Sequence, residues 1–364
     1  MSARLERIIR ELREKYLENV NCAVACVSGG VDSTVAAIVA KMALGEKVYP
    51  VFIDTGFMRE NEASAVQSAL RGLLDLEVYD FSERVVSAVE GLEDAEEKRK
   101  AFRDAFYSAV KAVAREKGCD WVVQGTIKAD VVETVGMIKT QHNVLSQELL
   151  QRYGLRVIEP LVDLFKHEVR ELAGFLGLPK SIVERQPFPG PGLLVRAVGK
   201  LTREKLELVR KITSVVEPYF EGKGFSQYFP ALWEYNVIEE GEVNGLEYSV
   251  FGVKVTGVVS GKRTYGYPVV VTNWRGALQG AYSVYKLFDT QNHPHVLVQL
   301  LDKGKGEYLI ALRVVLTRDF MSAEVPLISR EEVDQLVNEV LKYPSIRAIA
   351  LDVTPKPPAT IEYE

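Results

Sequence analysis

The sequence contains few cysteines and histidines, and it has no long hydrophobic run. Its 364 residues include 3 cysteines and 4 histidines. The cysteines are Cys22, Cys26 and Cys119, whose spacing is not that of a metal site, so we expect buried free thiols. No apolar run approaches the ~18 residues of a membrane span, and residues 1–6 do not resemble a signal-peptide core. A cytoplasmic protein with no membrane partner is therefore expected.

The sequence also lacks an excess of positive charge. Its formal net charge is −5, whereas proteins that bind nucleic-acid polymers usually carry a basic surface. We therefore expect no nucleic acid as a partner, while a small anionic ligand needs only local positive charge. The length and the hydrophobic content of 47% are typical of a chain with two domains.

One segment near the N-terminus combines a predicted strand, a Gly-rich loop and a helix start. Residues 22–27 are small or apolar without alternation, as in a parallel strand that is buried on both faces. The loop that follows is Ser28-Gly29-Gly30-Val31-Asp32-Ser33-Thr34, and an Ala/Val/Ile-rich helix comes next. Backbone N–H groups at a helix start have no internal partners, so they form an anion site. A tight turn without function is the alternative, although six constrained positions in this context favour a phosphate site.

Asp32 is unusual in such a loop because its carboxylate would repel a phosphate. A cation between the two negative charges removes this conflict, so Asp32 is a candidate Mg²⁺ ligand. The loop is not a Walker A motif, which would end in Gly-Lys-Ser/Thr. It resembles the pyrophosphate loop (PP-loop) of the N-type ATP pyrophosphatases. This resemblance implies an ATP site where the bond between the α and β phosphates is cleaved.

Strands and helices are expected to alternate through the first half of the chain. We expect strands at 22–27, 48–56, 76–81, 119–126 and 155–161, and helices at 3–19, 60–71, 93–116 and 165–176. Such alternation predicts an α/β fold with a doubly wound parallel sheet. The carboxyl ends of its strands would bring Asp54, Gly125 and Thr126 toward the loop. For Asp54, a turn-forming Asp-x-Gly sequence is an equally good explanation.

A long polar segment follows the fourth expected strand. Residues 128–153 have little apolar periodicity, and such a segment beside an active site is more readily a mobile lid than packed structure. An ordinary surface excursion is the alternative. Its candidate functional residues are Asp130, Glu133, Lys139, Thr140, His142 and Asn143.

A rigid connector marks the expected domain boundary. Residues 187–192 contain three prolines and two glycines, which excludes a helix or a central strand. We therefore expect domains at 1–192 and 193–364, the second rich in strands. Residues 272–306 are expected to be irregular. The sequence His293-Pro294-His295 is weak support for a metal site, because no third ligand is indicated.

Five segments together resemble the ATP-pyrophosphatase subunit of the GMP synthase family, without its glutamine amidotransferase domain. The segments are residues 28–34, Gln124-Gly125-Thr126 with Asp130 and Glu133, residues 166–170, 185–192 and 356–364. The resemblance implies an adenine nucleotide alpha hydrolase-like PP-loop domain followed by a smaller α+β dimerisation domain. Against the short form of this family, residues 272–306 look like an insertion.

The resemblance also implies a ligase reaction that forms a C–N bond. ATP would adenylate the C2 oxygen of xanthosine 5′-monophosphate (XMP), with Mg²⁺ as cofactor and pyrophosphate as a product. Ammonia would then displace AMP to give GMP. No Gly-x-Cys-x-Gly nucleophile elbow is present, so a separate glutamine amidotransferase subunit would supply the ammonia. A homodimer formed through the C-terminal domain is also implied.

The site residues that the resemblance implies fall into three groups. The catalytic residues are Asp32, Asp130, Glu133, Lys139 and Lys166, with Asp32 as the metal ligand. The ATP-binding residues are Ser28, Gly29, Gly30, Val31, Asp32, Ser33, Thr34, Asp54, Gly125, Thr126 and His142. The XMP-binding residues are Arg99, Arg185, Gln227, Lys356, Thr360, Ile361 and Glu362.

The sequence departs from the family pattern at three positions. Ala348 stands where an arginine is expected, with Arg347 beside it, and Thr34 and Gln141 replace a serine and a histidine. Two other functions are compatible with a PP-loop fold: a tRNA-modifying enzyme and a non-catalytic nucleotide-binding dimer. The net negative charge and the absence of Cys-x-x-Cys argue against the first, and the intact Asp32 argues against the second.

Overall fold

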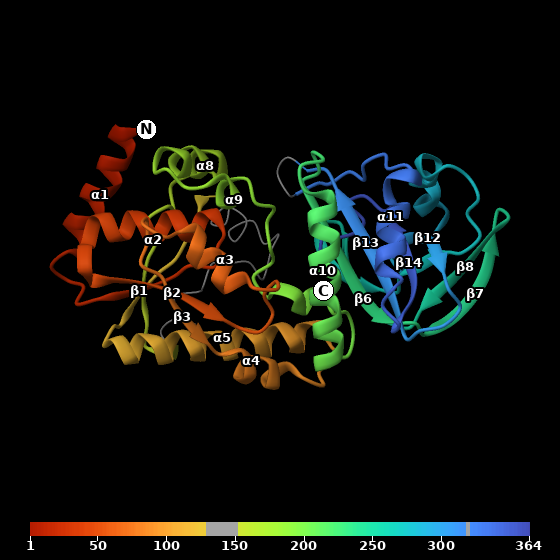
Figure 1. The fold of residues 1–364 in the computed structure, drawn as a ribbon, viewed down its shortest axis with the longest axis horizontal. Helices are drawn as coiled ribbons and strands as arrows, with labels where there is room; N and C mark the ends of the chain where they lie inside the picture. The colour runs from red at the N-terminus through yellow and green to blue at the C-terminus, as the bar shows by residue number, and fades with distance from the viewer. Residues whose placement is uncertain (129–151, 318–320) are drawn as a thin grey trace. The chain divides into compact units, whose positions relative to one another are not determined.

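The computed structural model describes residues 1–128, 152–317 and 321–364. The chain forms two compact units (Figure 1). The first unit consists of Met1–Ala88 and Ala101–Gly190, and the second consists of Val89–Lys100 and Pro191–Glu364. The expected domain boundary at residue 192 stays a prediction. A single boundary there would leave residues 89–100 in the first domain, whereas the structure groups them with the second unit.

The first unit contains a five-stranded parallel sheet in the order β3-β2-β1-β4-β5. Its strands are β1 (Ala23–Cys26), β2 (Val48–Asp54), β3 (Glu77–Asp80), β4 (Trp121–Val123) and β5 (Arg156–Ile158). All four neighbouring pairs are parallel. The expected doubly wound sheet is therefore confirmed. Since β1 lies at its centre, the loop after β1 opens at the point where the strand order reverses.

Helices cover both faces of this sheet, as Figure 1 shows for α2 and α8 on one side and α5 on the other. The helices are α1 (Ser2–Tyr16), α2 (Val31–Leu44), α3 (Glu62–Ala69), α4 (Ser82–Val89), α5 (Ala95–Lys117), α8 (Lys166–Phe175) and α9 (Lys180–Val183), with a 3₁₀ turn at Gly45–Lys47. Ala23 and Ala25 of β1 pack into the core with α1, α2 and α8. Val24 packs into the core with α5. Alternate side chains of one strand thus serve two cores, so every position is apolar.

The expectation of three free thiols is wrong, because Cys22 and Cys119 form a disulfide. These residues are separated by 97 positions in the sequence, but their Cα atoms lie 5.0 Å apart. Each lies just before a strand, and β1 and β4 are parallel neighbours with Ala23 opposite Trp121. Sheet pairing therefore brings the two cysteines together, which no local spacing indicates. Cys26 is free, and burial raises the pKa of its thiol to about 12.

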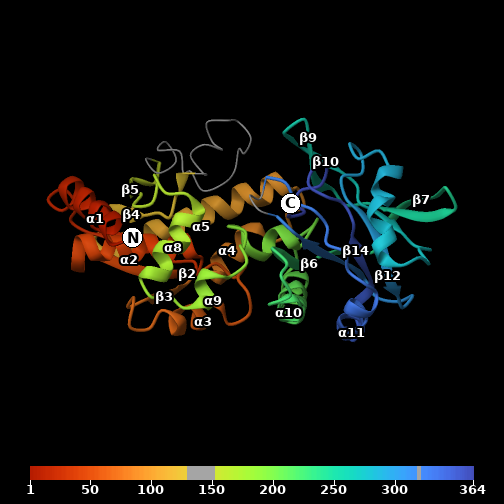
Figure 2. The same ribbon diagram turned by 90° about the horizontal axis from the view of Figure 1, so that it is seen from above.

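The second unit is built on a mixed seven-stranded sheet in the order β6-β13-β14-β12-β11-β8-β7. Its strands are β6 (Gln227–Glu234), β7 (Val237–Val243), β8 (Leu246–Phe251), β11 (Val269–Val271), β12 (Val296–Asp302), β13 (Tyr308–Val315) and β14 (Ile346–Asp352). A separate hairpin, labelled in Figure 2, pairs β9 (Val255–Val259) with β10 (Lys262–Gly266). The expectation of a strand-rich second domain is confirmed.

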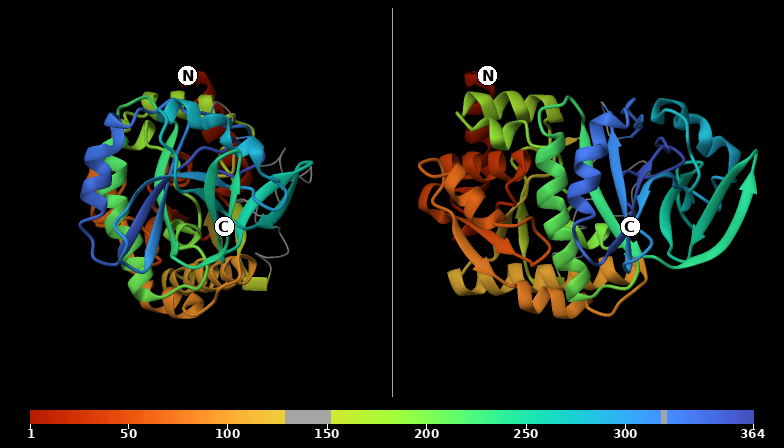
Figure 3. Two further views of the ribbon diagram at one scale, coloured as in Figure 1. Left: turned by 90° about the vertical axis from the view of Figure 1, so that its right-hand side faces the viewer. Right: turned by 45° about the vertical axis from the view of Figure 1, so that its right-hand side comes forward.

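Two helices of the second unit, α10 (Arg203–Phe220) and α11 (Glu331–Val340), lie side by side (Figure 3). Thr202 caps α10, since its side chain accepts a hydrogen bond from the Lys205 N–H. Short 3₁₀ helices occur at Gly192–Arg196 and Leu278–Leu287. No helix in the described ranges is long and apolar enough to cross a membrane.

The expectation of irregular structure at 272–306 is wrong for much of that range. β12 (Val296–Asp302) is a central strand between β14 and β11. Val296, Leu297 and Val298 are completely buried, and the strand shows the continuous apolar run of an interior position. The preceding histidines and proline hide this strand from the sequence pattern.

Candidate active site

The PP-loop forms the link between β1 and α2. Gly30 is the N-cap of α2 with an extended backbone, and Gly29 has a φ of +81°. A Cβ atom on Gly29 would lie 2.5 Å from Val66 Cγ2, so both conformation and space require glycine. Ser33 Oγ donates to Gly30 O at 3.1 Å and accepts from the Ser28 N–H at 3.2 Å. The loop is therefore held closed by its own side chains.

Thr34 lies at the junction between the loop and α2. Its side chain is completely buried, and both its N–H and its hydroxyl donate to Gly30 O, at 3.1 and 2.8 Å. The expected ATP contact of Thr34 stays a prediction. The N–H groups at Val31, Asp32 and Ser33 are those that have no acceptor within the helix.

The end of β4 lies against the start of α2. A Cβ atom on Gly125 would lie 2.7 Å from both Asp32 C and Ser33 N, so only glycine permits this approach. Thr126 follows and is buried, and its Oγ1 has no hydrogen-bond partner among the residues that the structure describes. The structure therefore brings Gly125 to the PP-loop, as the parallel-sheet argument expects.

Asp32 and Lys166 form an ion pair at the mouth of the loop. Lys166 Nζ lies 2.5 Å from Asp32 Oδ2, and the side chains are about 30% exposed. Lys166 is the first residue of α8, whose start is fixed by a hydrogen bond from the Phe165 N–H to Glu168 Oε2 at 2.8 Å. This bond lowers the pKa of Glu168. Two helix starts thus place a carboxylate and an ammonium group together.

The second oxygen of Asp32 has the character of a cation ligand. Within the described part of the chain, Oδ1 is buried without a hydrogen-bond partner. Burying such an oxygen without a hydrogen-bond donor or a cation beside it costs folding free energy. No group of three or more His, Cys, Asp or Glu side chains that could hold a metal occurs in residues 1–128, 152–317 and 321–364. Within these ranges, Asp32 is therefore not part of a preformed cluster of metal ligands.

Arg185 lies beside the PP-loop in the first unit, and its expected XMP contact stays a prediction. Its Nη2 donates to Glu62 Oε2 at 2.6 Å, and its Nη1 would be 3.1 Å from a Cβ on Gly29. Glu62 is buried and also lies 3.9 Å from Arg59. The Arg59 guanidinium stacks 4.1 Å from the centre of the Phe188 ring. Phe188 thus anchors the Pro-rich connector to the PP-loop domain through its contact with Arg59. This contact explains why an aromatic residue occurs among the prolines.

Asp54 adopts the turn role that the sequence left open. Its Oδ1 accepts a hydrogen bond from the Gly56 N–H at 2.8 Å, and Gly56 has a φ of +77°. The carboxylate therefore stabilises the turn after β2. The expected ATP contact of Asp54 stays a prediction.

The C-terminal tail, residues 354–364, is packed into the second unit. Ile361 and Tyr363 enter its hydrophobic core, so these two side chains face away from solvent. Thr360 contacts Thr256 through their hydroxyls at 2.6 Å. Glu362 is held by Arg196 through two hydrogen bonds of 3.1 and 3.2 Å. The expected XMP contact of Ile361 would therefore fall to its backbone.

Asp352, at the end of β14, is the centre of a buried polar cluster that precedes the tail. It accepts from His295 Nδ1 at 2.6 Å and from the Tyr363 hydroxyl at 2.7 Å. Arg313 lies 3.1 Å away and donates to the carbonyls of Thr354 and Thr360, at 2.6 and 2.9 Å. Burial alone would raise the pKa of Asp352, but Arg313 and these hydrogen bonds lower it to about 2. Burial lowers the pKa of His295 despite the opposing effect of Asp352.

The remaining expected XMP-binding residues also lie in the second unit. Arg99 is in α5, within the segment Val89–Lys100 that belongs to this unit. Gln227 begins β6 and is buried, and the backbone of Lys356 pairs with Ala323. Their contacts with XMP stay predictions. Asp130, Glu133, Lys139, Thr140, His142 and Asn143 lie outside the described residues, as does the expected lid.

Arg347 cannot replace the arginine expected at position 348. Adjacent residues of a strand face opposite sides, and Ala348 is buried in the core. Arg347 instead lies 3.4 Å from Asp302 and stacks 3.8 Å from the centre of the Tyr235 ring. Its side chain is therefore used on the opposite face of β14.

Comparisons with known proteins connect both units to one family. The GMP synthase C terminal domain matches residues 294–363, and the Thiamine biosynthesis protein (ThiI) family matches residues 19–188. The chain is 45% identical to one subunit of the glutamine-hydrolyzing GMP synthase of Sulfurisphaera tokodaii, with 100% of each chain covered. It is 36% identical to the corresponding subunit from Archaeoglobus fulgidus, with 99% of this chain and 98% of the relative covered.

The chain belongs to the family of the GMP synthase ATP-pyrophosphatase subunit. This confirms the family resemblance of the five sequence segments. A solved structure, the NH3-dependent NAD synthetase of Campylobacter jejuni, is 20% identical and covers 50% of this chain and 75% of its own. Its TM-score of 0.38 is too low to carry an argument.

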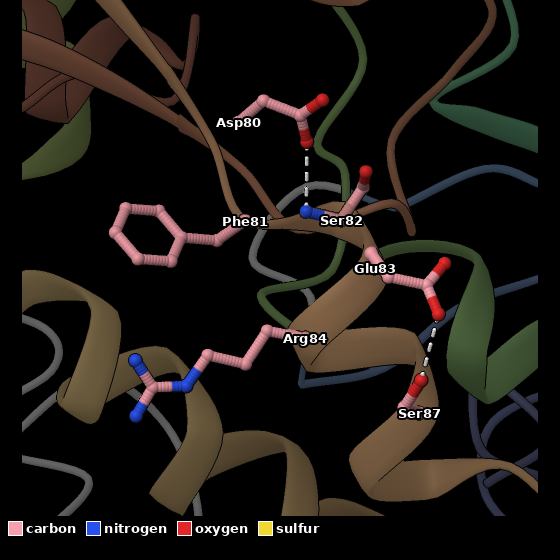
Figure 4. Close-up of a pocket in the computed structure, with 6 residues that line it drawn as sticks. All are labelled: Asp80, Phe81, Ser82, Glu83, Arg84 and Ser87. Atoms are coloured by element: carbon pink, nitrogen blue, oxygen red, sulfur yellow. Dashed lines mark hydrogen bonds between the residues drawn. The ribbon is translucent and has the colours of Figure 1, made fainter.

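A shallow hollow elsewhere in the first unit is lined by none of the PP-loop residues. Its volume is about 340 Å³, and Figure 4 shows its lining at the end of β3 and the start of α4. The lining residues are Asp80, Phe81, Ser82, Glu83, Arg84 and Ser87. Asp80 accepts from the Ser82 N–H at 2.8 Å, and the Ser87 hydroxyl donates to Glu83 at 3.1 Å. These bonds are those of an ordinary helix start.

Two buried charged side chains and one buried polar cluster of the chain are not predicted from the sequence. Glu62 and Arg196 are buried charged residues whose partners are distant in the sequence, and the cluster around Asp352 joins four segments. A buried glutamate inside a helix has the same sequence pattern as a solvated one. Arg196 directly follows the apolar residues Leu193-Leu194-Val195. This apolar context is the one sequence signal that could have indicated its burial.

Proposed function

We propose that the chain catalyses the ATP-dependent amination of XMP to GMP in two steps. In the first step, the C2 oxygen of XMP attacks the α phosphorus of ATP, the bond to the β phosphate breaks, and pyrophosphate leaves. In the second step, ammonia attacks C2 and AMP leaves with the original C2 oxygen. The single observation that carries this proposal is the glycine-lined helix start at Gly30, with Asp32 and Lys166 at its mouth.

Charge development in the first step explains why this geometry suits pyrophosphate. The leaving group gains negative charge, which N–H groups at a helix N-terminus stabilise through their fixed dipoles. Gly125 allows β4 to approach without a side chain between the strand end and the loop. Lys166 supplies a positive charge at the same mouth, and it is close enough to Asp32 to be oriented by that carboxylate.

We propose Asp32 as the protein ligand of a Mg²⁺ ion. Its buried Oδ1, which lacks a hydrogen-bond partner among the described residues, fits this role. When bound, Mg²⁺ would neutralise charge on the phosphate oxygens. Lys166 would orient the Asp32 carboxylate through its contact with Oδ2, which leaves Oδ1 available to the cation.

The ammonia is proposed to come from a separate glutaminase subunit. The relatives support this source, since each is named as one subunit of a glutamine-hydrolyzing enzyme. The XMP site is proposed at the tail and Arg99 of the second unit. Thr360 and Glu362 have their side chains held by partners within that unit, as a preorganised binding segment requires. Dimer formation through the second unit stays a prediction.

The test is pyrophosphate release from ATP with the purified chain, Mg²⁺ and ammonium chloride, with and without XMP. We expect release that depends on XMP, with GMP and AMP formed in equal amounts. Omitting XMP and adding tRNA is the matched control. Release with tRNA alone would assign the chain to tRNA modification, and binding of ATP without release would assign it to a non-catalytic role.

A second measurement tests the source of ammonia. Glutamine replaces ammonium chloride, and the reaction is run with and without a glutaminase subunit from a relative. We expect glutamine to support GMP formation in the presence of that subunit alone. Equal activity with glutamine in its absence contradicts the proposed partner.

A further inference from the structure

We propose that Arg196 is a positioning residue that sets the orientation of the Glu362 carboxylate for nucleotide recognition. This inference rests on the proposed function, in which Glu362 binds XMP. Arg196 itself does not need to touch the nucleotide, because its side chain is completely buried.

The contact between the two residues fixes the plane of the carboxylate. Arg196 Nε donates to Glu362 Oε2 at 3.2 Å, and Nη2 donates to Oε1 at 3.1 Å. Such a paired arrangement defines both the position and the rotation of a carboxylate, whereas a lysine would define its position alone. The Glu362 side chain is 19% exposed, while that of Arg196 is 0% exposed. The glutamate is therefore held from its buried side.

Arg196 is itself held from two other directions. Its Nη1 donates to Glu217 Oε1 of α10 at 3.2 Å, and its guanidinium stacks 4.1 Å from the centre of the Phe229 ring of β6. Glu217 balances the buried positive charge, so the pair does not depend on Glu362 for neutralisation. Because α10 and β6 are regular elements in mutual contact, they form a rigid support.

Glu362 lies between two buried residues of the tail and is itself partly exposed. Ile361 and Tyr363 enter the core, whereas the Glu362 side chain is 19% exposed. Glu364, two positions further, is also buried and pairs with Lys98, and it accepts from the Gly199 N–H at 2.8 Å. Each tail glutamate thus has its own buried cation. Of the two, Glu362 is the partly exposed one.

The remaining acceptor capacity of Glu362 suits the N–H donors of a purine-dione base. A carboxylate offers about four acceptor positions, and Arg196 fills two of them. The other two would accept ring N–H groups, with directions that Arg196 determines. Loss of Arg196 would let the carboxylate rotate, which weakens XMP binding without affecting the PP-loop.

The experiment compares R196Q with the unmodified chain in the pyrophosphate-release assay. We expect the KM for XMP to rise about tenfold, equivalent to about 1.4 kcal/mol, while the KM for ATP changes less than about twofold. R196K keeps the buried charge and provides the measurement if R196Q does not fold. In the double variant R196Q/E362Q, we expect the KM for XMP of E362Q alone, because Arg196 acts through Glu362.

K205M is the matched control for loss of a buried cation. Lys205 is fully buried in the same unit and pairs with Glu234 at 2.9 Å, which is not a tail residue. K205M should leave the KM for XMP within about twofold. An unchanged KM in R196Q and R196K, or an equal rise in K205M, overturns the positioning role. Absence of XMP-dependent release from the unmodified chain overturns the proposed function and this inference with it.

Discussion

The two units hold their charged residues in opposite ways. At the PP-loop of the first unit, Asp32 and Lys166 are about 30% exposed, and the loop presents backbone N–H groups. In the second unit, Asp352, His295 and Arg313 are completely buried and bonded to one another. The first arrangement leaves charges available to a ligand, and the second uses charges to fix the chain. Removing Asp32 should therefore affect catalysis, whereas removing Asp352 should affect stability.

The largest expected effect is on stability, from D352A. Removing the carboxylate leaves the buried Arg313 without an opposite charge and His295 Nδ1 without its hydrogen-bond partner, which costs about 3–5 kcal/mol. Denaturant unfolding measures the change, and Asp334, an exposed partner of Arg330 in the same unit, provides D334A as control. If D352A lowers the free energy of unfolding by less than about 1 kcal/mol, Asp352 acts like a surface residue. The contrast between the exposed PP-loop charges and the buried Asp352 cluster is then wrong.

The same variant has an expected pH dependence. The folded state lowers the pKa of Asp352 from 3.8 to about 2. A lowered pKa means that the carboxylate contributes stability above about pH 4, and that this contribution is lost as the pH falls toward 2. The stability difference between the unmodified chain and D352A should therefore narrow by about 2–3 kcal/mol between pH 5 and pH 2. If the stability difference between the two proteins stays constant from pH 5 to pH 2, the pKa of Asp352 is not lowered in the folded state.

D32A should give the next largest effect, on catalysis. We expect kcat for pyrophosphate release to fall about 10²–10³-fold, because the proposed cation loses its protein ligand. The melting temperature should stay close to that of the unmodified chain, since Asp32 is partly exposed and its ion pair contributes little to stability. D334A again serves as the control. Unaltered turnover in D32A contradicts the metal-ligand role.

The disulfide provides a third test, away from both charged regions. The double variant C22S/C119S should lose about 2–4 kcal/mol, because the Cys22–Cys119 link constrains a long loop in the unfolded chain. C26S is the control, since Cys26 is free. Thiol titration of the denatured protein should find one thiol before reduction and three after it. Three thiols before reduction would show that the bond does not form.

G125A should give the smallest effect. The added Cβ would meet Asp32 C and Ser33 N at 2.7 Å, so either the loop or β4 must shift, at a cost of about 1–3 kcal/mol. We expect the KM for ATP to rise and the KM for XMP to stay constant. G174A is the control, because nothing lies within 4 Å of a Cβ at that position. Equal kinetics in both variants contradict the close approach of β4 to the loop.

Most helices and strands of the first unit can be predicted from the sequence, because the patterns that indicate them lie within short segments. The loop at 28–34 is contiguous, and alternating strands and helices indicate a parallel sheet. The prediction misses α4 and ends several elements a few residues away from their observed bounds. In the second unit, the sequence indicates many strands but not their order or pairing, since each strand's partners and burial depend on the whole sheet.

The sequence by itself determined the PP-loop, the family and the doubly wound sheet, because glycine, small apolar residues and helix starts act within a few positions of one another. Tertiary structure alone decided the Cys22–Cys119 bond, the placement of Arg185 beside Gly29 and the pairing of Arg196 with Glu362. These contacts join residues that are about 100 or more positions apart. Their energies depend on burial and distance, and neither quantity is defined until the chain has folded.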